Sequence, residues 1–277
     1  MTRPAAPRGL RAALVAARTT TAGAPRGRRR LGLMLLVGIP VLVQTLGLIF
    51  GDSGRGEGFQ VFADIVTEAY LLLITPLTMI FLGTAAFGDE WAGGTAHYVV
   101  GLPISRGTLV AGRWLASARR GIYFLLPPIT ACFVLCLIGF EGGIMHYLAD
   151  LGLVLLVVSY LALAYGAIFM FFGLALKRAV MISLIYVFLF ELLTANLPQT
   201  FASLSLGFHG RNILWQLTGN DRFQLDTLNV FEVAPMSVTW SVFWIAGVGL
   251  LATLLSSVML RRKECGGEIA ASDAAAT

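Results

Sequence analysis

The chain contains six apolar runs, each close to the length that a helix needs to cross a lipid bilayer. A helix rises about 1.5 Å per residue, so roughly 20 residues span about 30 Å of hydrocarbon. A backbone in lipid must satisfy its own hydrogen bonds, and these runs lack the alternation of barrel strands, so they predict transmembrane helices. The six predicted spans are residues 31–50, 65–87, 121–140, 151–176, 179–195 and 237–260.

Composition agrees with an all-α, polytopic membrane protein. Of the 277 residues, 57% are hydrophobic and only 13% are charged, which lies well outside the range of soluble globular domains. We expect a basic N-terminal segment (1–30), a six-span transmembrane domain (31–260) and a short tail (261–277). The first apolar run is too long for a signal peptide and no small-residue cleavage site follows it, so we interpret it as an uncleaved span.

The distribution of positive charge predicts the orientation of the spans. Lys and Arg gather in 1–30, in 88–120, at the Lys177-Arg178 turn and in the tail, whereas 51–64 and 141–150 are acidic or neutral. The positive-inside rule therefore predicts a multi-pass protein of the cell membrane with both termini in the cytoplasm. This arrangement leaves no basic face for nucleic acid, despite the net charge of +5. The Lys and Arg residues outside the segments assigned to the cytoplasm are Arg55, Arg211 and Arg222.

Residues 88–120 form a polar island between the second and third predicted spans. Asp89 and Glu90 end an apolar run, and Pro103 forces a break. Ser105 follows, and its hydroxyl can cap a second helix. We expect two short cytoplasmic helices here, the second of which continues from Ser105 into the third span.

At these residues the chain resembles the permease subunits of ABC exporters, the ABC type-2 permease family. Between its second and third spans that family carries an acidic residue a few positions before Gly-Thr, then an apolar stretch and Pro-x-Ser-Arg. The matching residues are Glu90, Gly94-Thr95 and Pro103-Ile104-Ser105-Arg106. The chain departs from the family after Gly-Thr, where the family often has Leu-Glu and this sequence has Ala96-His97-Tyr98.

The resemblance implies a transport subunit, not an enzyme, that binds a separate ABC ATPase and pairs with a second permease copy or a paralogue. ATP and Mg would lie on the ATPase, and no cofactor is expected in this chain. The sequence agrees, because its only lysines, Lys177 and Lys263, are not preceded by Gly and cannot belong to a phosphate-binding loop. The residues that would couple the permease to the ATPase are Asp89, Glu90, Gly94, Thr95, Tyr98, Pro103, Ser105 and Arg106.

Glu68 and Glu191 are the two acids within apolar runs, where an ionised group is costly. They could face the bundle interior as residues of a substrate path or a proton relay. We favour solvation near the headgroups, because each lies within about two turns of the outer surface. An intramembrane enzyme or a proton-coupled carrier that uses these acids is the alternative function.

The sequence predicts no metal site. Cys132 and Cys136 share one helix face at a spacing that a soft metal could use, but no Met or His on the same span completes a site. We interpret them as small apolar packing residues. His97, His146 and His209 lie on different segments.

Two further features concern packing. The segment 196–236 mixes apolar and polar residues, so we expect short re-entrant or interfacial helices before the sixth span, with Trp215 at headgroup level. Small residues allow helices in a membrane to approach closely. The candidates for such contacts are Gly166 and Gly173, or Gly247 and Gly249.

Overall fold

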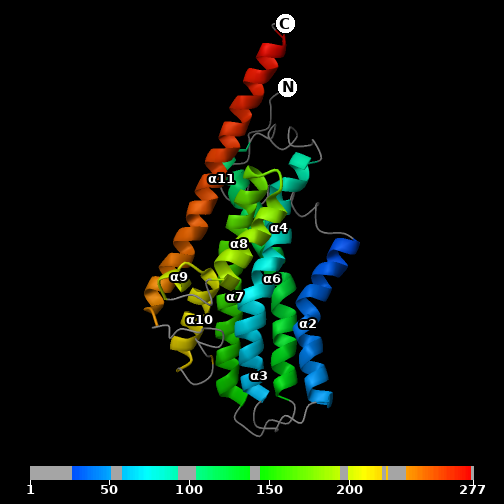
Figure 1. Cartoon of the computed structure of the whole chain (residues 1–277), viewed down its shortest axis with the longest axis vertical. Helices are drawn as coiled ribbons and strands as arrows, with labels where there is room; N and C mark the ends of the chain where they lie inside the picture. Colours follow the sequence, from blue (N-terminus) through cyan, green and yellow to red (C-terminus); the bar gives the residue numbers. More distant parts are fainter. Residues whose placement is uncertain are drawn as a thin grey trace, which may run out of the picture.

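The structure is a computed structural model that describes residues 27–50, 58–92, 104–137, 144–193, 199–219, 223 and 235–275. Within these ranges every regular element is a helix, so the predicted all-α class is confirmed (Figure 1). In chain order the elements are α2 (Arg28–Phe50), α3 (Gly58–Asp64), the π-helix η1 (Ile65–Ile74), α4 (Thr75–Ala92), α6 (Arg106–Cys136), α7 (Ile144–Ala175), α8 (Ala179–Val187), the π-helix η2 (Phe188–Leu193), α9 (Gln199–Ala202), α10 (Leu206–Leu217) and α11 (Val238–Ala275).

Five helical stretches in the described chain are long and apolar enough to cross a membrane, as expected of a helical membrane protein. The fifth predicted span corresponds to a shorter apolar helix, Ala179–Leu193, which comprises α8 and η2. Figure 1 shows that α2 begins and α11 ends at the same end of the bundle. The five stretches are Arg28–Ile49, Phe59–Asp89, Arg106–Cys136, Tyr147–Ala175 and Val238–Arg262.

Helix α7 lies at the centre of the bundle and packs against α4, α6, α8, α10 and α11. Its contact with α4 brings backbone against backbone, because a Cβ added to Gly173 would lie 2.8 Å from Thr84 Cα. A Cβ added to Gly166 would lie 3.0 Å from Met79 Cε, so the predicted close contacts at Gly166 and Gly173 are confirmed. Gly249 approaches α7 less closely, and Gly247 has no atom within 4 Å of an added Cβ.

The second predicted span changes from π-helix to α-helix just before Pro76. Proline has no backbone N–H, and in a regular α-helix its ring clashes with the carbonyl four residues earlier. The widened turns that precede Pro76 accommodate this ring, and the Thr75 N–H bonds to the Tyr70 carbonyl in the longer π register. The sequence analysis did not anticipate this π-helix.

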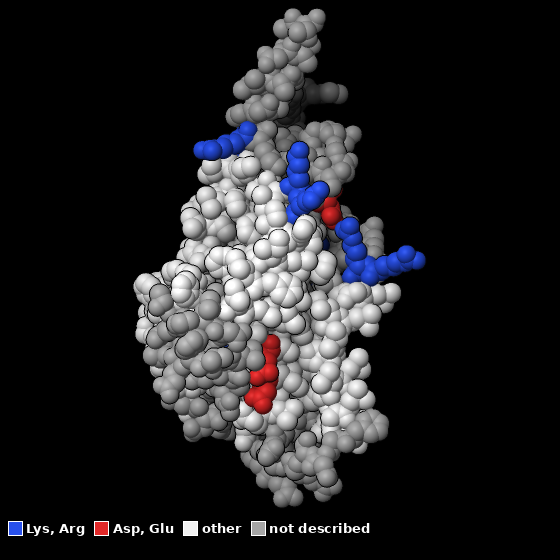
Figure 2. Space-filling model, viewed as in Figure 1, with Lys and Arg blue, Asp and Glu red and all other residues white. Residues whose placement is uncertain are grey.

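Basic side chains gather toward one end of the described surface. Figure 2 shows Lys and Arg over the upper half, where Figure 1 places the start of α2, with acidic atoms beside them, and an acidic patch in the lower half. Lys177 and Arg178 are exposed in the tight turn between α7 and α8, and Arg261 and Arg262 are exposed on α11. We call the upper end the basic end and, following the orientation that the sequence predicts, the lower end the outer end.

Replacement of Gly173 by Val should destabilise the bundle, because the added methyl groups meet the α4 backbone, which cannot rotate away. Overpacking of this kind costs about 1–3 kcal/mol. Thermal unfolding of the purified chain in detergent measures the effect. Gly152→Val is the matched control, since Gly152 lies on the same helix with nothing within 4 Å of an added Cβ. Equal losses in both variants would contradict the close contact.

Candidate functional site

The carboxylate of Glu191 is fully buried and holds the first turn of α10. Its Oε2 accepts hydrogen bonds from Ser205 Oγ at 2.5 Å and from the Gly207 N–H at 3.0 Å. Its Oε1 accepts from the Leu206 N–H at 3.2 Å. Both oxygens are therefore engaged by one short stretch of chain.

The chemistry of a helix start explains why a carboxylate lies at this place. The first N–H groups of a helix have no partner within it, and the helix dipole makes this end electropositive. Ser205 is the N-cap of α10, and its Oγ accepts from the Phe208 N–H at 3.0 Å while it donates to Glu191. The two oxygens of this buried side chain are thus engaged by three donors of the segment 205–207.

Glycines allow α10 to approach the bundle. A Cβ on Gly207 would lie 2.9 Å from Glu191 Oε2 and 3.5 Å from the Leu71 carbonyl of η1. A Cβ on Gly210 would lie 2.7 Å from Leu161 Cδ1 on α7. A larger residue at either position would require the side chains of Glu191, Leu71 or Leu161 to shift.

A second polar network ties α10 to α11. His209 Nε2 lies 2.9 Å from the Ser203 carbonyl, so this nitrogen carries the proton and donates. Nδ1 then accepts from Ser241 Oγ at 3.0 Å, and Ser241 Oγ in turn accepts from Asn212 Nδ2 at 2.9 Å. Burial lowers the pKa of His209, which favours this neutral form, although the bond to the Ser203 carbonyl opposes the shift.

We call the cluster formed by α10 with Glu191 and Ser241 the outer plug. In it, α10 contacts both π-helices as well as α7 and α11. π-Helices are rare and occur often at functional sites. The outer plug therefore joins the outer halves of four predicted spans through one short helix.

The structure corrects one interpretation of the two membrane acids. Solvation near the headgroups is wrong for Glu191, whose side chain is 0% exposed because α10 folds back over it. Glu68 lies in η1 and is half-buried. Short helices in the segment before the sixth span are present as α9 and α10, and Trp215 packs against Ala202 and Phe208.

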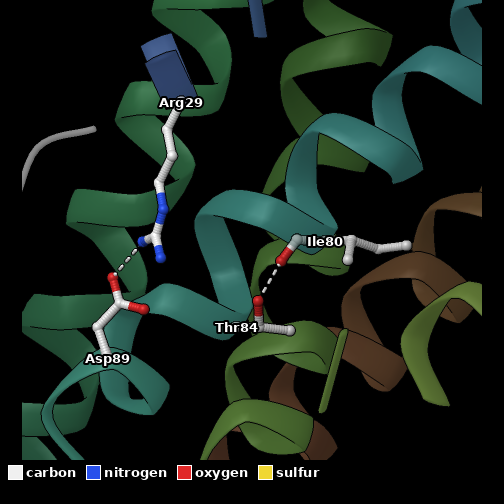
Figure 3. Close-up of polar contacts among 4 residues, drawn as sticks. All are labelled: Arg29, Ile80, Thr84 and Asp89. Carbon is white, nitrogen blue, oxygen red and sulfur yellow. Dashed lines mark hydrogen bonds and ion pairs between the residues drawn. The ribbon is translucent and has the colours of Figure 1, made fainter. Parts of the chain in front are cut away.

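The predicted coupling residues are only partly described. Asp89 is exposed at the end of the second span and forms an ion pair with Arg29 of α2 at 3.0 Å (Figure 3). Ser105 caps α6 as predicted, since its Oγ accepts from the Thr108 N–H at 3.3 Å, and Arg106 is the first residue of that helix. The Glu90 side chain and residues Gly94, Thr95, Tyr98 and Pro103 lie outside what the structure describes.

Arg113 is a residue whose role the sequence analysis missed. It is 1% exposed, its Nη1 donates to the Ala86 carbonyl at 2.5 Å, and its guanidinium lies 4.6 Å from the centre of the Phe87 ring. The signal was present in the helical spacing, because Arg113 falls on the buried face that Leu109 and Ala116 define. Through these contacts Arg113 holds the first turns of α6 against the end of α4.

Cys132 and Cys136 lie in the core of α6, and Cys136 Sγ donates to the Phe133 carbonyl at 3.0 Å. Their packing agrees with the interpretation as apolar residues. Within the described ranges no three His, Cys, Asp or Glu side chains gather as a metal site would require.

Comparison with known protein families finds no family that matches the chain, and comparison with curated proteins finds no similar protein. Function has to be inferred from the residues and their geometry.

Replacement of Glu191 by Ala should loosen α10, because Ser205 and two backbone amides lose their acceptor. Hydrogen–deuterium exchange of residues 206–214 should rise by an order of magnitude or more, since each unsatisfied buried donor costs about 1–3 kcal/mol. Glu191→Gln should have a smaller effect, because its amide oxygen still accepts. Glu68→Gln is the control acid, and unchanged exchange in Glu191→Ala would show that α10 is held by its apolar contacts alone.

Proposed function

We propose that this chain is the membrane-spanning permease subunit of an ABC exporter, which forms the translocation path and is driven by a separate ATPase. The proposal begins from the motif between the second and third predicted spans. The observation that carries it is the continuity of α6, which starts at the Ser105-Arg106 end of that motif and runs 31 residues without interruption into the third span. A stiff helix of this kind can transmit movement from a cytoplasmic partner into the membrane.

Two contacts at the basic end support a lever at this position. Arg113 holds α6 to the last turns of α4, so the two spans that flank the motif would move together. The Arg29–Asp89 ion pair links the end of the second span to α2 (Figure 3). The ion pair is more than half exposed on both sides, so it contributes less than about 1 kcal/mol and can break during a cycle.

The proposed topology has six spans, with both termini in the cytoplasm of a cell that carries the protein in its plasma membrane. The fifth span is the weakest, because α8 and η2 contain only 15 residues and cover about 22 Å. The outer plug supports this span, since Glu191 attaches η2 to the start of α10.

In the proposed complex, a second permease copy or a paralogue forms the other half of the path, and ATP and Mg lie on the ATPase. During the transport cycle each permease chain would then tilt as a unit, with the packed α4–α7 pair at its centre. The rival function, an intramembrane enzyme or a proton-coupled carrier, requires Glu68 or Glu191 to exchange protons. The hydrogen bonds of both Glu191 oxygens to the start of α10 favour a structural role for that residue.

Cysteine accessibility tests the topology. In a background without native cysteines, Glu57→Cys, His146→Cys and Asp221→Cys should react with an impermeant reagent from outside, because they lie in sequence segments without positive bias. Thr108→Cys and Lys177→Cys should react only from inside. Labelling of Thr108→Cys from outside would overturn the six-span arrangement.

Coupling tests the function. The purified chain alone should not hydrolyse ATP. In complex with the ATPase, the variants Glu90→Ala, Gly94→Val and Arg106→Ala should insert into the membrane normally. Each variant should nevertheless lower both transport and stimulated ATP hydrolysis about tenfold. The physical reason is that these residues belong to the sequence motif that is proposed to receive movement from the ATPase. Arg119→Ala, an exposed arginine of the same helix, is the matched control. Normal transport by all three variants with the ATPase still bound would place the coupling surface elsewhere.

A further inference from the structure

A cleft of about 530 Å³ opens near the basic end, between α2, α4, α6 and α8. Its volume lies within the range of small-molecule sites in proteins. The lining combines charged residues with apolar walls, and the residues that matter here are Arg29, Asp89, Arg120, Leu33, Leu36 and Phe81.

The charges in the cleft do not cancel. Asp89 is already paired with Arg29 at 3.0 Å. Arg120 has no carboxylate within ion-pair distance among the described residues, and the hydrogen bond of its side chain runs from Nε to the Ala116 carbonyl at 3.3 Å. Among the described residues that line the cleft, Arg29 and Arg120 therefore outnumber the single carboxylate of Asp89. The net positive charge of these residues suits an anionic ligand.

The cleft is open toward the apolar side of the bundle. Phe81 and Val180 both line it, and their side chains are 49% and 39% exposed. Gly32 also lines the cleft and is exposed on α2. A ligand can therefore enter from the bilayer, with its apolar part against Leu33, Leu36 and Phe81. A water-soluble anion without an apolar part would make no favourable contact with these walls.

We propose that this cleft binds an anionic amphiphile with a single apolar chain, whose phosphate or carboxylate head is held by Arg120. As an assignment of the cargo class it rests on the proposed function, whereas the binding site itself does not. The arginine is the recognition residue, because a half-buried guanidinium at the end of a span is costly unless an anion or water reaches it. The apolar walls then select for a chain-bearing anion.

The test uses the purified full chain in phosphatidylcholine nanodiscs, with dodecyl phosphate as the probe and empty nanodiscs as background. We expect saturable binding that dodecylphosphocholine, the zwitterionic match, does not compete for. Arg120→Gln should weaken binding about tenfold or more, because the charge-assisted hydrogen bonds are lost. Arg119→Gln is the matched control. It removes the same charge at the neighbouring position, and the Arg119 side chain does not line the cleft.

A cleft-filling pair keeps the test decisive if Arg120→Gln lowers the thermal stability of the chain. Gly32→Phe should block the cleft and abolish binding, whereas Gly47→Phe, at the other end of the same helix, should not; neither glycine has an atom within 4 Å of an added Cβ. Equal losses in Arg119→Gln and Arg120→Gln, or unchanged binding in Gly32→Phe, would overturn the site. Because the measurement needs no ATPase, binding by a chain that proves to have no ATPase partner would overturn the proposed function and leave the site intact.

Discussion

The close approach of α4 and α7 is the contact on which the bundle depends. In a bilayer, burial of one apolar side chain against another gains little, since lipid is as apolar as leucine. Helices associate instead where small residues let backbones meet and where side chains bond to carbonyls of a neighbouring helix. Gly83 and Gly173 supply the first condition along this pair, with Phe169 Cβ only 2.9 Å from an added Cβ on Gly83.

Side chain to carbonyl bonds supply the second condition and extend the bundle outward from α7. Trp114 of α6 donates to the Leu163 carbonyl of α7 at 2.8 Å, and Tyr160 of α7 donates to the Val242 carbonyl of α11 at 2.7 Å. Tyr70 of η1 reaches the Val37 carbonyl of α2 at 3.0 Å. These bonds use oxygens that already accept within their own helices, so they join helices without breaking them.

The two ends of the bundle are held differently. At the outer end, the buried hydrogen bonds of Glu191, His209 and Asn212 fix α10 against the spans, which favours a rigid closure. At the basic end, α2 and α4 are separated by an open cleft and linked by an exposed ion pair. A change in the position of α2 therefore costs less free energy than a change at the outer end. Movement applied through α6 would therefore change the basic end first, while the outer plug yields only when Glu191 and the start of α10 separate.

The sequence alone determined the all-helical class, the apolar stretches, the cap at Ser105 and the small residues at Gly166 and Gly173, because each depends on local spacing or on the length of an apolar run. It could not determine the partner of Glu191, since Ser205 is 14 residues away along the chain and only the fold of α10 brings the two together. The same holds for Arg113, for the pairing of Arg29 with Asp89, and for the cleft beside Arg120. Those features depend on which helices become neighbours, and that choice is made by packing around α7 and not by any one segment.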